Sequence, residues 1–207
     1  MTIIDKLATV LHRKDEGPNQ ELARDIAERE DCEAVKELIA NLSNKDKNIQ
    51  SDCMKVLYEI GYLKPALIAE YSKEFLTLLD HRNNRLVWGA MTALDAITLE
   101  NPEVIYASLE KIVDSTDKGS VITKDHGVNI LIKLCSVESY ANHAFTLLIE
   151  QLKRCPTNQL PMYAENAVSI VNDQNKALFI KTLFSRLGDI EKDTKRKRVE
   201  KVIKKCS

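Results

Sequence analysis

Glycine and proline are scarce in this sequence, with six and five residues among 207. A β-sandwich or a dinucleotide-binding domain needs more glycine, because its turns and phosphate-binding loops use the conformational freedom of that residue. Runs in which apolar and polar residues alternate, as in a half-buried strand, are also missing. Leu, Ala, Lys, Glu and Ile dominate instead, so the composition predicts an all-α protein.

The five cysteines show no pairing pattern, because their number is odd and no two stand at a C-x-x-C spacing. This argues against a disulfide framework or a structural zinc site and favours a reducing compartment. We therefore expect a cytoplasmic protein. Residues 1–6 contain no basic segment followed by a long apolar core, and no apolar run is long enough to span a bilayer. We expect neither a secretory signal nor contact with a membrane.

Motifs of catalysis are missing as well. The sequence has no G-x-S-x-G, no P-loop and no G-x-G-x-x-G. Its four histidines stand at no metal-ligand spacing, and His126 cannot form a dyad with the adjacent Asp125 because neighbouring helical residues point about 100° apart. We expect no enzyme activity, no metal and no cofactor.

An apolar template recurs about every 37 residues, which is the period of a helical-repeat protein. Its spacings of four, three, one and three place the side chains on one stripe of a helix. The second position is small in the first four copies, as expected where two helices cross closely. The copies are Ile49, Cys53, Val56, Leu57, Ile60; Leu86, Ala90, Ala93, Leu94, Ile97; Thr123, Gly127, Ile130, Leu131, Leu134; Leu160, Ala164, Ala167, Val168, Val171; and Lys195, Val199, Val202, Ile203, Cys206.

The template resembles the second helix of a HEAT repeat, and residues 79–94 (LDHRNNRLVWGAMTAL) are the nearest copy. HEAT repeats usually carry Arg or Lys one place after the first aliphatic position. Lys124 and Arg196 match this feature, whereas Gln50, Val87 and Pro161 do not. The resemblance implies a right-handed α-solenoid of about six helical pairs and leaves an armadillo-type arrangement open.

The pairs are expected at residues 2–30, 33–62, 70–99, 103–137, 141–172 and 175–206, within a single repeat domain of residues 1–207. Within the first pair, residues 3–11 are expected to form one helix and residues 20–29 the other, with Gly17-Pro18-Asn19 as the break between them. Each pair leaves an apolar stripe that only a neighbouring pair can cover.

The resemblance further implies that the second helices line a concave face. Wheel positions two before, two after and five after the small residue should be exposed on it. These columns hold Ser51, Trp88, Asp125, Met162; Lys55, Thr92, Asn129, Asn166; and Tyr58, Asp95, Ile132, Ser169. Exposed aromatic and Met side chains with few charges are typical of an interface core. The predicted binding residues are Tyr58, Trp88, Thr92, Asp95, Asn129, Ile132, Met162 and Asn166.

The main functional hypothesis is therefore a non-catalytic scaffold or adaptor that holds another protein or a peptide on this face, with Trp88 as anchor. If the wheel is wrong by one residue, Trp88 instead packs in a crevice between helices. The alternative is a nucleic-acid-binding protein, because the fold also resembles HEAT-like DNA glycosylases for alkylated bases. These use an aromatic-lined basic groove and an aspartate, for which Trp88, Tyr58 and Asp95 are the candidates here.

The C-terminal end is basic, with eight Lys or Arg against three Asp or Glu in residues 191–207. Lys195, Arg196, Lys197, Arg198 and Lys201 are the candidate patch. Val199, Val202 and Ile203 continue the core template. The preferred interpretation of this segment is therefore a capping helix whose polar face is exposed to solvent. The other two interpretations are contact with an acidic partner or with nucleic acid, and a nuclear-import patch at residues 195–198.

Overall fold

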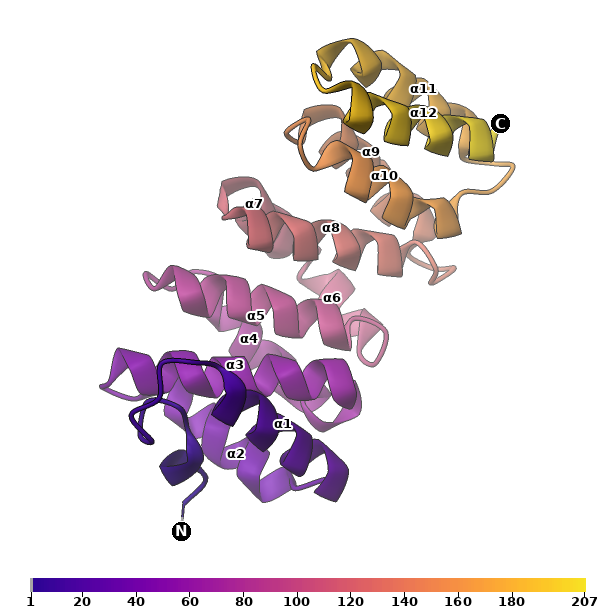
Figure 1. Cartoon of the computed structure of the whole chain (residues 1–207). Coiled ribbons are helices and arrows are strands. Elements are labelled where there is room, and N and C mark those ends of the chain that lie inside the picture. The colour runs from indigo at the N-terminus through magenta and orange to yellow at the C-terminus, as the bar shows by residue number, and fades with distance from the viewer. Residues whose placement is uncertain (1) are drawn as a thin grey trace. The chain divides into compact units, whose positions relative to one another are not determined.

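The computed structural model describes residues 2–207, and helices account for all the regular secondary structure found there (Figure 1). The chain divides into two compact units, one ending at Gly127 and the other beginning at Val128. Each unit is described by itself below. The expectation of a single domain over residues 1–207 therefore stays a prediction.

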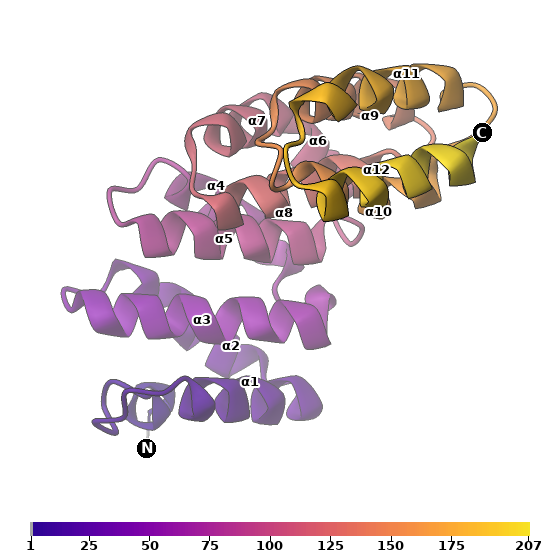
Figure 2. The ribbon, with the colours of Figure 1, turned by 45° about the horizontal axis from the view of Figure 1, so that its top comes forward.

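The first unit is built from antiparallel helical pairs. The second helices α1, α3 and α5 pack side by side, and α2 and α4 pack against α3 and α5 to form the other layer (Figure 2). After α5 the chain forms the short helices α6 and α7 and then enters α8. The elements are η1 (Ile3–Lys6), α1 (Gly17–Arg29), α2 (Cys32–Ala40), η2 (Asn41–Ser43), α3 (Lys47–Leu63), η3 (Pro65–Leu67), η4 (Ala69–Tyr71), α4 (Ser72–Leu78), α5 (Asn84–Ile97), α6 (Pro102–Ala107), α7 (Leu109–Lys118) and α8 (Val121–Leu134), whose end lies in the second unit.

The second unit repeats the arrangement with two further pairs. Helix α9 packs against α11, α10 against α12, and α11 against α12. Its elements are α9 (Ala141–Arg154), α10 (Leu160–Ala167), η5 (Val168–Ile170), α11 (Lys176–Arg186), η6 (Leu187–Asp189) and α12 (Asp193–Cys206). The predicted fourth pair, at residues 103–137, contains three α-helices, because α6 and α7 are separate helices. The division of the chain into six pairs stays a prediction.

The first pair differs from the prediction. Residues 3–11 do not form one helix, because only η1 is regular and turns follow it. The predicted break at Gly17-Pro18-Asn19 is instead the first turn of α1. Proline suits that turn, since the amide hydrogen it lacks would have no partner within the helix.

Most template positions form the core, as predicted. The exceptions are half-buried: Ile49, Val168, Val171, Lys195, Ile203 and Cys206. All five positions of the copies that begin at Leu86 and Thr123 are buried. The small residues have the expected reason: a Cβ added at Gly127 would lie 2.8 Å from two carbon atoms of Thr116 on α7, and closer still to its hydroxyl. A similar approach occurs at Gly89, where a Cβ would lie 2.5 Å from Met54 Cγ.

In two copies of the template, the residue that follows the first template position donates hydrogen bonds to carbonyls of the preceding helix or linker. Lys124 Nζ donates to the carbonyls of Thr116, Asp117 and Gly119 at 3.0, 2.7 and 3.0 Å. Arg196 donates to the carbonyl of Ile190 at 2.7 Å. Carbonyls at a helix end have no partner within the helix, so a long cationic side chain stabilises them.

Gln50 occupies the same template position and also donates, to the carbonyl of Asn44 at 2.8 Å. It is therefore a functional substitute for the basic residue that the HEAT pattern leads one to expect. Val87 and Pro161 have no side-chain donor and cannot replace it.

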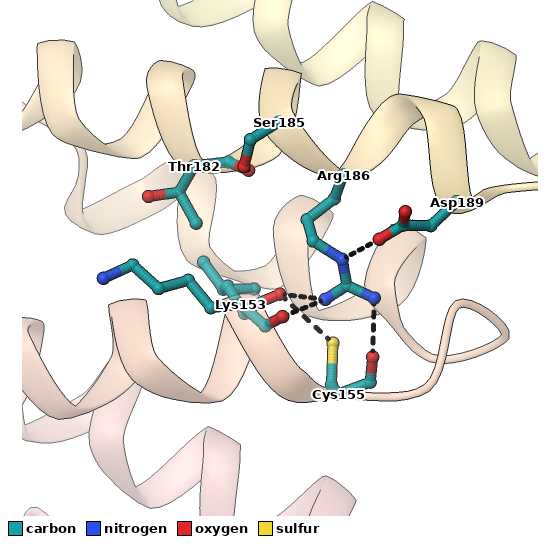
Figure 3. Close-up of polar contacts among 7 residues, drawn as sticks. Lys153, Cys155, Thr182, Ser185, Arg186 and Asp189 are labelled. Carbon is teal, nitrogen blue, oxygen red and sulfur yellow. Dashed lines mark hydrogen bonds and ion pairs between the residues drawn. The ribbon is translucent and has the colours of Figure 1, made fainter.

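A second capping device joins α11 to the end of α9 (Figure 3). Arg186 donates to the carbonyls of Leu152, Lys153 and Cys155 at 2.7, 2.7 and 3.0 Å, and its Nε pairs with Asp189 at 2.7 Å. The carbonyl groups at the end of α9 are thus satisfied by a residue of the next pair, which locks the two pairs of the second unit together.

Candidate partner-binding groove

A groove of about 760 Å³ runs along the first unit. Its walls are residues 8–16, which follow η1, and the outward faces of α3 and α5. The N-terminal wall is fixed by buried polar contacts: the Thr9 amide donates to Asp52 on α3 at 2.7 Å, and the Ala8 amide donates to the buried Asn19 on α1 at 2.9 Å. These contacts make the segment part of the site although it has no regular structure.

An aromatic cluster lies in and beside the groove, which is lined by two of its members, Tyr58 and Trp88. The ring of Trp88 on α5 lies 5.7 Å from that of Tyr58 on α3, at an interplanar angle of 55°. Tyr58 in turn meets Tyr62 edge to face, with centroids 6.1 Å apart. Trp88 is only partly covered, whereas Tyr58 is buried beneath it. The Tyr58 ring supports the indole from one side and leaves part of its surface for a ligand.

One cation of the groove, Lys55, is already paired with carboxylates. Lys55 Nζ lies 4.9 Å from the centre of the Tyr58 ring and pairs with Glu16 and Glu59, each at 2.7 Å. Burial alone would lower the pKa of Lys55, but the two carboxylates outweigh it and raise that pKa above its usual value. Lys55 is charged at neutral pH and ties the N-terminal wall to α3.

Three predicted site residues of this unit are buried, and Tyr58, at 6% exposure, is the first of them. Thr92 is 2% exposed, and its hydroxyl donates to the Trp88 carbonyl at 2.8 Å. Asp95 is 5% exposed and contacts Nδ1 of His126 at 2.7 Å. The prediction that Tyr58, Thr92 and Asp95 lie on an open face is wrong, because neighbouring helices cover these positions. Trp88 is the predicted residue that remains accessible.

The burial of Asp95 also bears on the glycosylase alternative. That hypothesis depended on an aspartate on the exposed face beside Trp88 and Tyr58. In the structure, Asp95 is held within the helical layer by His126, and Tyr58 is covered. The arrangement removes the exposed aspartate on which the alternative relied.

The other predicted residues lie in the second unit. Ile132 is buried at 8% exposure, which contradicts the exposed position predicted from the helical wheel. Asn129 and Asn166 lie on neighbouring helices and share a hydrogen bond of 3.2 Å, and Met162 is partly exposed. That these residues share one binding face with Trp88 stays a prediction.

The basic C-terminal patch is mostly engaged within the second unit. Lys195 donates to Asn158 Oδ1 at 2.6 Å, Arg196 caps Ile190, and Arg198 forms a two-point contact with Glu165 at 2.8 and 2.5 Å. Lys197 and Lys201 remain exposed, with Lys197 paired to Asp193 at 2.8 Å. These contacts support the interpretation of α12 as a cap, since they fasten it to α10 and to the preceding turns.

Within residues 2–207, no three His, Cys, Asp or Glu side chains are grouped so that they could hold a metal ion. None of the helices in that range combines the length and the apolar character that crossing a membrane requires.

Solved structures with this arrangement of helices include designed repeat proteins. One, described as computationally designed armadillo repeat proteins for modular peptide recognition, is 13% identical, with a TM-score of 0.65 over 99% of this chain and 98% of its own. A second, a designed armadillo repeat protein in complex with the peptide (KR)4, is 14% identical, with a TM-score of 0.64 over 99% and 97%. An engineered protein is 18% identical, with a TM-score of 0.61 over 100% and 98%.

The chain has an armadillo/HEAT-like helical-repeat fold. No family model matches the sequence, and no curated protein matches it significantly. The helical-repeat fold agrees with the predicted all-α solenoid class. It does not identify a partner, since fold alone carries little functional information.

Two features in or beside the groove were not predicted from the sequence. Tyr62 completes the aromatic cluster, and its position four residues after Tyr58 on the same helix face was the signal that could have indicated it. The wall formed by residues 8–16 had no such signal, because its place depends on backbone contacts with Asn19 and Asp52.

Proposed function

We propose that this protein is a non-catalytic binding module that holds a segment of another protein in the groove of its first unit. The observation that carries the proposal is the accessible indole of Trp88, which is supported from one side by Tyr58 within a groove of about 760 Å³. Partly covered aromatic side chains in such hollows are the commonest energetic anchors of protein interfaces.

The helical-repeat neighbours support a peptide or protein as the ligand, since two of them are described by their recognition of peptides. The electrostatics of the groove are compatible with this class. Arg13, Lys14, Lys55 and Arg85 line the groove, but Arg13 is paired with Asp15, and Lys55 is paired with Glu16 and Glu59. Two of these four cations are thus neutralised, which weakens the attraction of the groove for a nucleic-acid backbone. Five free cysteines support our further proposal of a cytoplasmic location.

Trp88 is the only tryptophan of the chain, which makes it both the test residue and a reporter. Affinity capture from a lysate of the source cell would compare the wild type with Trp88→Ala, with and without nuclease. Phe184→Ala is the matched control, because Phe184 is an aromatic residue of the second unit that is 68% exposed.

We expect Trp88→Ala to lose a protein that the wild type and the control both retain after nuclease treatment. An anchor of this kind is worth about 2 kcal/mol or more, which corresponds to roughly thirtyfold in Kd. The binding of the captured protein should also shift the emission of Trp88 in the wild type. Equal capture by all three proteins, or capture that nuclease abolishes, would contradict the proposal.

A further inference from the structure

A second hollow of about 730 Å³ adjoins the groove and has a different chemistry. It lies between the first turns of α3 and α5 and the linker before α5. The groove and the hollow share a wall made by Asn48, Ser51 and Arg85. One extended ligand can therefore occupy both.

The charged side chains of this hollow are mainly cationic. Lys47, Arg82 and Arg85 line it, and all three are exposed. Its acid is Asp80, whose carboxylate is paired with Lys111 on α7 at 2.6 Å. An anion entering the hollow would meet three cations and a carboxylate that already has its own partner.

The histidine of the hollow presents a further donor. The backbone amide of Asn83 donates to Nδ1 of His81 at 3.0 Å, so Nδ1 must be unprotonated. In the neutral ring the hydrogen is then on Nε2, which can donate to a ligand. The hollow thus combines a histidine donor with the guanidinium groups, which suit the planar recognition of carboxylate or phosphate.

The charge of the hollow differs from that of its surroundings. The first unit as a whole carries more acidic than basic side chains. A long polyanion would meet this acidic surface outside the hollow, whereas a short segment with one acidic residue would not. Because the cations are confined to the hollow and the surrounding surface is acidic, a short acidic peptide is favoured over a nucleic acid.

We infer that the partner segment carries an acidic or phosphorylated residue that binds Lys47, Arg82 and Arg85 while a neighbouring apolar residue covers Trp88. This inference rests on the proposed function and specifies its ligand. Arg85 and Trp88 are three residues apart on α5, about 4.5 Å along the helix axis. In an extended peptide, side chains two positions apart lie on one face about 7 Å apart. The acidic and the apolar residues are thus two positions apart, since adjacent side chains of an extended chain point to opposite faces.

The test uses fluorescein-labelled short peptides in a Gly-Ser background. Each holds one Leu and, two positions away, either Glu, phosphoserine or Lys, and binding is measured by fluorescence anisotropy. The protein variants are Arg82→Ala/Arg85→Ala, Trp88→Ala and the control Lys73→Ala. Lys73 is an exposed cation on α4 that lines neither the groove nor the hollow.

We expect the Glu and phosphoserine peptides to bind better than the Lys peptide. The double arginine variant should weaken both by about tenfold or more, and Lys73→Ala should leave them unchanged. A stronger response to phosphoserine than to Glu would identify a phosphorylated partner. Trp88→Ala should weaken all three peptides alike.

The two proposals fail in different ways. Equal or tighter binding of the Lys peptide, still dependent on Trp88, would overturn the acidic preference and leave the groove intact. Acidic binding that ignores Trp88→Ala would overturn the shared site. Binding of a DNA duplex that needs Arg82 and Arg85, with no peptide bound, would assign the hollow to nucleic acid and overturn both proposals, as would the absence of any binding.

Discussion

The close crossing of α7 and α8 at Gly127 gives a sharp test of the packing. In Gly127→Ala, the new methyl group would lie 2.8 Å from Cβ and Cγ2 of Thr116 and nearer still to its hydroxyl. Thr116 is 1% exposed, and its hydroxyl is bonded to the Ile112 carbonyl at 2.7 Å. It cannot move away without losing that bond, so the two helices must separate.

The expected magnitude is a balance of two effects. Alanine is favoured over glycine within a helix by roughly 0.8–1.0 kcal/mol. Overpacking of a filled core costs about 1–3 kcal/mol, and the upper part of this range applies because Thr116 is buried and anchored. The net loss of unfolding free energy should be about 2 kcal/mol. The double variant Gly127→Ala/Thr116→Ala should recover part of it, because only the contact between the two Cβ atoms remains.

The assay is urea unfolding monitored through the fluorescence emission of Trp88, which lies in the same unit as Gly127. Gly188→Ala is the control, since nothing lies within 4 Å of a Cβ at that position. Because Gly188 lies in the second unit, this variant is also followed by circular dichroism, and its unfolding midpoint should stay near that of the wild type. If Gly127→Ala is as stable as the wild type, the α7–α8 crossing is not tight and our reasoning on the small template position is wrong.

Three further predictions concern capping, pH and thiols. Arg186→Ala should lower the free energy of unfolding, measured by circular dichroism, by about 2 kcal/mol or more, because the carbonyls at the end of α9 lose their donors. Arg186→Lys should recover only part of this stability. The hydrogen bond from Arg198 lowers the pKa of Glu165 from 4.5. Its stabilisation is therefore present above pH 4.5 and lost as the pH falls through the folded-state pKa, so Glu165→Gln should cost less than about 1 kcal/mol at neutral pH and nothing in acid. Burial raises the pKa of Cys53 to about 12, so iodoacetamide at neutral pH should modify the exposed Cys32 well before Cys53, as mass spectrometry would show.

The core could be predicted because it depends on local periodicity. A stripe that recurs with the period of a helix must face the neighbouring pair, so the burial of Leu86, Ala90 and Leu94 follows from the sequence. The small residue at Gly127 follows from the same argument, since only a close crossing requires it.

Contacts between helices could not be predicted in this way. Asp95 meets His126 across thirty-one positions, a separation that matches neither a helical turn nor the repeat. Arg186 reaches the end of α9 from the next pair. Such contacts depend on the shift and rotation of one helix against another, which the pattern within each helix does not contain.

The same limit explains where the accessible surface lies. The wheel treats each second helix as if it were alone, and it therefore assigns three equally exposed columns. In the first unit, the column five places after the small residue is buried at Tyr58 and Asp95, whereas the column two places before it stays partly open at Ser51 and Trp88. The accessible strip thus lies toward the starts of α3 and α5, where the groove and the hollow are found. A ligand of this unit must approach these helix starts, and its contact with Arg85 and with Trp88 follows from that geometry.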